Sequence, residues 1–294
     1  MDTPDRIEVI ANGVTFAALA AGPQDGPLAL CLHGFPDTAH TWRYLLPELA
    51  AAGFRAVAPW MRGYAPSSVP ADGNYGPGAL AADAGALHSA LNGDERAVLI
   101  GHDWGAIAAY GAANFALDRW SRLVTGAVPP LAALGEKQFA YEQVKRSFYM
   151  YVFQTPMAEQ LVGLGDMAFI DGLWRDWSPG YDASDDLAAV KDALRAPGNL
   201  SAAIGYYRAM LGATSPDATY AAEAAAITGV APQPTLFLHG DQDGSASENV
   251  HADAGDFLSP GSRVETISGT GHFFHLEKPS EVNQLIVEWV TAKN

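Results

Sequence analysis

Short apolar segments alternate with segments of helical spacing over the first 130 residues of the chain. The apolar segments predict strands at residues 6–10, 14–19, 28–32, 54–59, 97–100 and 123–128. Helical patterns separate the later strands near residues 42–52, 79–91 and 104–114. Strands that alternate with helices in this way predict an α/β fold with a mostly parallel sheet and helices on both faces.

The alternation stops after residue 130. Residues 136–225 have a helical pattern rich in aromatic side chains. Proline and glycine interrupt that pattern at residues 156, 178–180 and 197–198. Strand signals return at residues 235–238 and 263–267, and a final helical pattern closes the chain. We therefore predict a core domain of residues 1–130 and 230–294, interrupted by a helical cap of residues 131–229.

Composition narrows the classes of function. Hydrophobic residues make up 49% of the chain, charged residues 17%, and the formal net charge is −16 at pH 7. Because so acidic a surface repels phosphate backbones and anionic lipids, we expect neither nucleic acid nor membrane as a partner. The single cysteine, Cys31, lies in an apolar segment, which predicts a core residue without a disulfide. No long apolar run and no leader-like start are present, so we expect a cytoplasmic protein.

Candidate chemistry follows the predicted strands, because ligands of open α/β sheets bind outside the carboxyl ends of the strands. Residues 101–105, GHDWG, have the pattern of a nucleophile elbow, a tight turn with glycine on both sides. Its central residue is Asp103, where such elbows often have serine. An alternative is that Asp103 only caps the helix that follows.

Two further candidate catalytic residues, Asp243 and His272, each follow a later predicted strand. Asp103, Asp243 and His272 come in the nucleophile, acid, histidine order of the α/β-hydrolases. Asp241 follows the same strand as Asp243, and His275 lies close to His272, so both stay open as alternatives. The histidines lack the paired spacing of a metal site, and we expect neither a metal nor a cofactor.

These residues lie in motifs that resemble the epoxide hydrolase and haloalkane dehalogenase branch of the α/β-hydrolases, and the epoxide hydrolases most closely. The motifs are HGFP at 33–36, MRGY at 61–64, GHDWG at 101–105, GxxD at 240–243 and GHFFHLEKP at 271–279. The resemblance implies Asp103 as nucleophile, Asp243 as acid and His272 as base. It also implies an oxyanion hole at the backbone N–H groups of Phe35 and Trp104. Trp60 and Ala65 depart from the usual pattern beside the second motif and leave this catalytic set intact.

The chemistry assigns further roles. A carboxylate that attacks carbon forms an alkyl ester, which water must then hydrolyse with help from a base. An epoxide oxygen also needs a proton donor, and tyrosine, with a pKa of about 10, suits that task. By resemblance to two segments of epoxide hydrolase caps, Tyr149 and Tyr207 are the expected donors, while Tyr151 and Tyr206 stay open as alternatives. The side chains expected to contact substrate are those of Phe35, Trp104 and Phe153.

We therefore expect an epoxide hydrolase that converts an apolar small-molecule epoxide into a vicinal diol. One alternative is a haloalkane dehalogenase with the same three residues, in which Trp104 and an indole N–H of Trp174 or Trp177 would bind halide. Phe35 stands where haloalkane dehalogenases often have a halide-binding asparagine, which disfavours that alternative. A second alternative is a binder of small molecules without catalysis on the same fold. The sequence does not distinguish a monomer from a homodimer.

Overall fold

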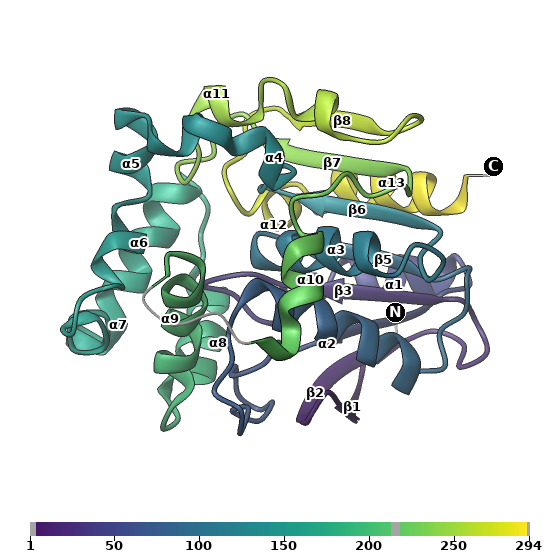
Figure 1. Ribbon diagram of the computed structural model, residues 1–294, viewed down its shortest axis with the longest axis horizontal. Coiled ribbons are helices and arrows are strands. Elements are labelled where there is room, and N and C mark those ends of the chain that lie inside the picture. The colour runs from purple at the N-terminus through teal and green to yellow at the C-terminus, as the bar shows by residue number, and fades with distance from the viewer. Residues whose placement is uncertain (1–3, 213–217, 293–294) are drawn as a thin grey trace.

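A single eight-stranded sheet forms the centre of the molecule (Figure 1). The computed structural model describes residues 4–212 and 218–292. The strands are β1 (Asp5–Ala11), β2 (Val14–Ala21), β3 (Leu28–Leu32), β4 (Arg55–Pro59), β5 (Val98–His102), β6 (Arg122–Gly126), β7 (Thr235–Gly240) and β8 (Arg263–Ile267). Their order in the sheet is β1-β2-β4-β3-β5-β6-β7-β8. Strand β2 is antiparallel to both of its neighbours, and all pairs from β4 to β8 are parallel, which confirms the predicted fold class.

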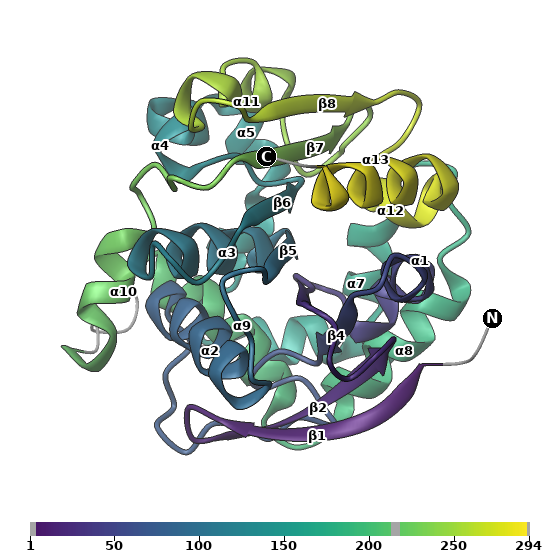
Figure 2. The ribbon, with the colours of Figure 1, turned by 90° about the vertical axis from the view of Figure 1, so that its right-hand side faces the viewer.

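Helices cover both faces of this sheet (Figure 2). Helices α1 (Leu45–Ala51) and α13 (Pro279–Thr291) lie on one face, and α2 (Pro77–Ala90) and α3 (Trp104–Phe115) lie on the other. Every residue of β3, β5 and β6 is buried, because a parallel strand covered on both faces has no side that meets water. Cys31 in β3 is fully buried, as expected for a core residue.

A cluster of helices lies beyond the carboxyl ends of the parallel strands (Figure 1). It contains α5 (Tyr141–Arg146), α6 (Phe148–Val152), α7 (Ala158–Trp177), α8 (Ser184–Arg195) and α9 (Asn199–Met210). The breaks between α6 and α7, between α7 and α8, and between α8 and α9 contain the three predicted interruptions, whereas the break between α5 and α6 at residue 147 was not predicted. A further break inside α7, where residues 164–167 leave the helical conformation, was not predicted.

Shorter elements connect these parts. They are α4 (Leu131–Leu134), α10 (Ala221–Ala226), α11 (Glu248–His251) and α12 (Phe274–Glu277), and the 3-10 helices at residues 39–42, 135–139, 218–220 and 254–257. Helix α10 packs on α2 and α3 although it falls inside the predicted cap range, and the limits of the cap at residues 131 and 229 stay a prediction. Among the described residues, no helix has the length and apolar character that a membrane crossing requires.

Candidate active site

Asp103 lies in the turn between β5 and α3. Its backbone has φ 53° and ψ −116°, a conformation that residues other than glycine rarely adopt. The glycines on either side make the turn possible, since a Cβ at Gly101 would meet the Gly105 carbonyl oxygen and a Cβ at Gly105 would meet that of Leu32. The Asp103 side chain makes no N-capping hydrogen bond to α3. The GHDWG segment thus has the geometry of a nucleophile elbow, with its carboxylate presented at the sheet edge.

Backbone N–H groups surround the Asp103 carboxylate. The Phe35 N–H donates to Asp103 Oδ1 at 2.8 Å. The loop after β3 can come this close only because residue 34 is glycine, since a Cβ at this position would overlap the Asp103 carboxyl group. Burial raises the pKa of Asp103, while the positive charge of His272 and hydrogen bonds from the Phe35 and Trp104 N–H groups lower it. Of the two N–H groups predicted for the oxyanion hole, that of Phe35 is hydrogen-bonded to Asp103, and that of Trp104 lies close enough to lower the pKa of Asp103.

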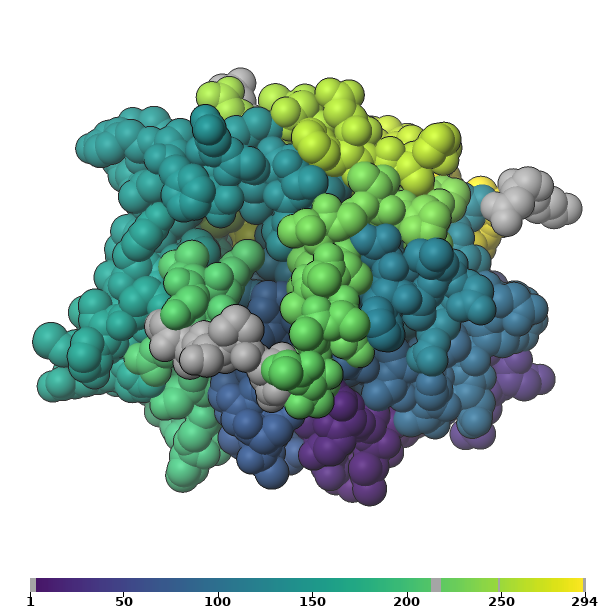
Figure 3. Space-filling model, in the orientation of Figure 1, coloured from purple at the N-terminus to yellow at the C-terminus, as the bar shows by residue number. Residues whose placement is uncertain are grey.

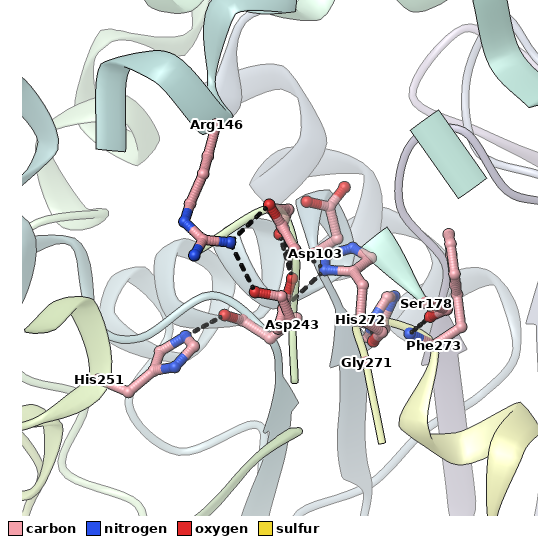
Figure 4. A network of polar contacts seen from close by, with 12 residues as sticks. Asp103, Arg146, Ser178, Asp243, His251, Gly271, His272 and Phe273 are labelled. Atoms are coloured by element: carbon pink, nitrogen blue, oxygen red, sulfur yellow. Dashed lines mark hydrogen bonds and ion pairs between the residues drawn. The ribbon is translucent and has the colours of Figure 1, made fainter. Parts of the chain in front are cut away.

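His272 and Asp243 form a buried pair beside Asp103 (Figure 4). His272 Nδ1 lies 2.9 Å from Asp243 Oδ2, and the buried Nε2 of His272 has no hydrogen-bond partner among the described residues. Burial alone would lower the pKa of His272, but the charge and hydrogen bond of Asp243 and the charge of Asp103 raise it above its ordinary value. The pKa of Asp243 is lowered despite burial, by His272 and by hydrogen bonds from Ser245. The pair is therefore suited to take a proton at Nε2.

The alternative acid and histidine lie elsewhere. The exposed carboxylate of Asp241 accepts hydrogen bonds from Ser268 Oγ at 2.9 Å and from the Gly269 N–H at 2.6 Å, and so stabilises the turn after β8. His275 Nε2 lies 2.5 Å from Thr41 Oγ1, and burial lowers the pKa of His275 to about 3. The structure brings Asp243, not Asp241, to His272.

Asp103 faces a cavity of about 130 Å³ with a mainly apolar lining. Its lining includes Trp104, Tyr149, Tyr207 and residues of α3, α4, α6 and the end of α9, and Figure 3 shows a hollow between α4 and α9. Burial raises the pKa of both tyrosines, so both carry their phenol protons at neutral pH. Their ring centroids are 5.5 Å apart, and the buried Tyr207 hydroxyl has no hydrogen-bond partner among the described residues. Two phenol donors thus share a cavity with the carboxylate.

The other aromatic residues considered from the sequence have different positions. The Tyr206 hydroxyl donates to the Arg62 carbonyl oxygen at 2.8 Å, and Tyr151 is 45% exposed at the edge of the cavity. Phe35 and Phe153 are fully buried, pack against each other with ring centroids 5.4 Å apart, and are not among the residues that line the cavity. Phe153 also packs against both Tyr149 and Tyr207. Direct contact of these two phenylalanines with substrate stays a prediction.

One group of buried side chains could hold a metal ion within the described part of the chain. Its ligand atoms, on Asp37, His102 and His275, lie within 4.8 Å of one another. Ligands at roughly 2.1 Å from a tetrahedral zinc ion would lie about 3.4 Å apart. The group would have to contract to bind zinc, and the reaction proposed below does not use it.

Sequence reasoning did not identify the residues that hold the loop after Asp243. Ser245 Oγ donates to Asp243 Oδ1 at 2.7 Å and lies 3.0 Å from His272 Nδ1. Gln143 of α5 donates to the Ser245 carbonyl oxygen at 3.0 Å. A serine two positions after a candidate acid is a signal that could have found Ser245. The sequence offers no such signal for Gln143, which lies 102 positions away from Ser245.

Comparison with known proteins agrees with this geometry. Residues 27–279 match the family described as alpha/beta hydrolase fold. The chain is 30% identical over 287 residues to the AB hydrolase superfamily protein YfhM of Bacillus subtilis, covering 96% of each chain. It is also 30% identical over 328 residues to Epoxide hydrolase A of Mycobacterium tuberculosis, covering 99% of each chain.

A solved structure gives the same result. An epoxide hydrolase from an endophytic Streptomyces superposes with a TM-score of 0.79 and 28% identity, covering 99% of this chain and 96% of the other. The chain therefore belongs to the α/β-hydrolase family, as a hydrolase of the branch that contains the epoxide hydrolases.

Proposed function

We propose that this protein hydrolyses apolar epoxides to vicinal diols through an ester of Asp103. The observation that carries the proposal is the presence of two protonated, buried tyrosines, Tyr149 and Tyr207, on the cavity that the Asp103 carboxylate faces. A halide leaves without a proton, whereas an epoxide oxygen leaves as a strongly basic alkoxide. The two phenols are the donors that an epoxide needs.

In the first step, an Asp103 oxygen attacks a carbon of the epoxide ring. A new carbon–oxygen ester bond forms, the ring bond between that carbon and the epoxide oxygen breaks, and its electron pair stays on the oxygen. Hydrogen bonds from Tyr149 and Tyr207 stabilise the developing charge, and one phenol proton moves to that oxygen.

In the second step, water hydrolyses the ester. His272 Nε2 takes a proton from the water as its oxygen attacks the ester carbonyl carbon, and Asp243 stabilises the imidazolium that forms. Negative charge develops on the former carboxylate oxygen, where the Phe35 and Trp104 N–H groups can hold it. Collapse of this intermediate breaks the bond between the carbonyl carbon and the alcohol oxygen. The released alcohol oxygen takes the proton from His272, which completes the diol. The second proton of the attacking water, left on the Asp103 carboxyl group, passes to the tyrosinate, so that the Asp103 carboxylate and the tyrosine are both regenerated.

Cavity and charge indicate the class of substrate. The lining is mainly apolar, and the net charge of −16 disfavours anionic substrates at long range. We therefore propose a neutral, mostly apolar epoxide that enters between the core and the helical cap. Phe153 supports this reaction by packing against both tyrosines.

Dehalogenation has less support from the contacts. The Trp174 indole N–H donates to the Pro36 carbonyl oxygen at 2.8 Å, so it is not free to bind a halide. Trp104 is the tryptophan found on the cavity lining within the described residues, and Trp177 is not part of that lining. A protein that only binds small molecules would have no use for the buried Asp243–His272 pair.

A parallel assay tests the proposal. Styrene oxide, a second neutral epoxide and a bromoalkane are incubated with the enzyme, and diol and bromide are measured together. Diol without bromide supports epoxide hydrolysis, bromide without diol replaces it with dehalogenation, and binding without either product replaces it with a binding role. In His272→Gln, a mass increase equal to one epoxide on the peptide that contains Asp103 should identify the ester.

A further inference from the structure

We propose that Gln143 and Ser245 are positioning residues that tie the cap to the Asp243–His272 pair. On this view, the short cap segment of residues 143–149 serves both half-reactions, since it carries a proton donor for ring opening and holds the loop of the water-activating acid. The inference rests on the proposed function and adds to it a physical link between the cap and ester hydrolysis.

Ser245 fixes the acid and the histidine together. Its N–H and its Oγ–H both donate to Asp243 Oδ1, each at 2.7 Å. The other carboxylate oxygen, Oδ2, lies 2.9 Å from His272 Nδ1. Because the Ser245 hydroxyl proton points at Asp243, a lone pair of Oγ can face His272 Nδ1, 3.0 Å away. Both carboxylate oxygens are thereby engaged, and the imidazole ring has two acceptors that fix its orientation.

Gln143 clamps the loop that contains Ser245. Its Nε2 donates to the Ser245 carbonyl oxygen at 3.0 Å, and its Oε1 accepts from the Ser247 N–H at 2.7 Å. The same Nε2 donates to Ser147 Oγ at 2.7 Å. The side-chain amide of Gln143 therefore bonds to one acceptor and one donor of the backbone at residues 243–247, the acid loop, as an adjacent β-strand would do. Arg146 lies over the same loop in Figure 4 and donates to the Gly244 carbonyl oxygen at 3.2 Å.

The clamp and the proton donor belong to one stretch of chain. Gln143 lies in α5, the buried Ser147 lies between α5 and α6, and Tyr149 lies in the first turn of α6. All three line the cavity that Asp103 faces, and so does Ser245. Tyr149 is also held by ring contacts with Phe153, Trp177 and Tyr207, so loss of the Gln143 amide should release the loop that contains Ser245 and leave the phenol in place.

Single-turnover kinetics of Gln143→Leu and Ser245→Ala test the inference. With excess enzyme and styrene oxide, ester formation and ester hydrolysis are both followed by intact mass of samples quenched at successive times. Hydrogen bonds to charged groups are worth enough that loss of one is expected to slow ester hydrolysis by about 10-fold or more. Ester formation should stay within about 3-fold of the wild type, so that the ester accumulates.

Matched variants separate positioning from simple stabilisation of the fold. Ser245→Thr keeps the hydroxyl and should hydrolyse the ester at close to the wild-type rate. Gln160→Leu makes the same substitution at an exposed position of α7 and should change neither rate. Thermal unfolding by circular dichroism identifies any variant that does not fold. Gln143→Glu keeps the size of the side chain but removes the N–H donor to the Ser245 carbonyl oxygen, and it replaces Gln143→Leu if that variant is unstable.

The possible outcomes distinguish a failure of the inferred link from a failure of the proposed function. Accumulated ester in Gln143→Leu and Ser245→Ala supports the link between cap and acid loop. Equal losses in both half-reactions, or no loss in either, overturn that link while leaving epoxide hydrolysis in place. Absence of both ester and diol from the wild-type enzyme overturns the proposed function itself, and that result is known before any variant is compared.

Discussion

Replacing Tyr149 or Tyr207 by phenylalanine removes a single hydroxyl group from the cavity and is the most direct test of how ring opening is catalysed. Both rings are buried and packed against each other, so phenylalanine keeps the aromatic contacts and removes only the proton donor. A hydrogen bond to a group that becomes charged is worth about 1.5–3 kcal/mol. Each 1.36 kcal/mol changes a rate by roughly tenfold, so ester formation should slow by about 10- to 150-fold in each variant.

The assay is the single-turnover rate of ester formation from a neutral epoxide, with the rate of ester hydrolysis as internal reference. Hydrolysis uses His272 and water, so its rate should change by less than about 3-fold in either variant. The variant that loses both hydroxyl groups should form ester more slowly than either single variant.

Tyr206→Phe and Tyr151→Phe are the matched controls. The Tyr206 hydroxyl is bonded to the Arg62 carbonyl oxygen, and Tyr151 is largely exposed. Removal of the Tyr206 hydroxyl should therefore cost about 0.5–1.5 kcal/mol of unfolding free energy and leave ester formation nearly unchanged. Ester formation that is slower in Tyr206→Phe than in Tyr207→Phe would refute the reasoning, as would wild-type rates in both Tyr149→Phe and Tyr207→Phe.

Three further predictions follow from the site and its surroundings. His272 must be neutral to take a proton from water, and in the ester the charge and hydrogen bond of Asp243 still raise its pKa, whereas the esterified Asp103 no longer contributes. Ester hydrolysis should therefore slow as the pH falls through the pKa of His272, and a rate constant that is flat between about pH 6 and pH 9 would contradict this. Gly34→Ala places a Cβ on the Asp103 carboxyl group, so activity should fall by at least about 10-fold while circular dichroism shows a folded protein, and near-normal turnover would speak against this close approach. Arg62→Met leaves the carboxylate of Asp83 buried without its guanidinium partner. The free energy of unfolding, measured with denaturant, should therefore fall by about 3–5 kcal/mol, and a fall of less than about 1 kcal/mol would contradict the prediction.

Strand positions were predictable because the covering of the sheet leaves a local signature. Strands β3 and β8 match their predicted ranges, and each other predicted strand overlaps an observed one. Three breaks in the helical cluster, those after α6, α7 and α8, were predictable because proline and glycine change the backbone at their own positions. The break at residues 164–167 of α7 was missed, because Gly165 alone is a weak signal within a helical pattern.

The helical pattern by itself does not distinguish neighbouring buried side chains of one helix, and the expectation of Tyr207 over Tyr206 came from the family resemblance. Tyr206 and Tyr207 of α9 are both buried, at 1% and 2% exposure, because the helix is covered on more than one side. Helical periodicity distinguishes a buried face of a helix from an exposed one. It does not tell whether a buried side chain lines the cavity, as Tyr207 does, or contacts the Arg62 carbonyl oxygen, as Tyr206 does. The strand pattern alone also left Asp241 and Asp243 open, and it was the GxxD motif at residues 240–243 that favoured Asp243.

The sequence by itself determined the type of fold, the strand ends that carry polar groups, and the turn that presents Asp103, because each depends on residues close together in the chain. Only the tertiary structure decided the contacts that span long separations. Gln143 and Ser245 lie 102 positions apart, and their hydrogen bond exists because the cap returns to the carboxyl ends of the strands. Local patterns cannot encode that meeting, since it depends on how the whole helical cluster packs against the sheet.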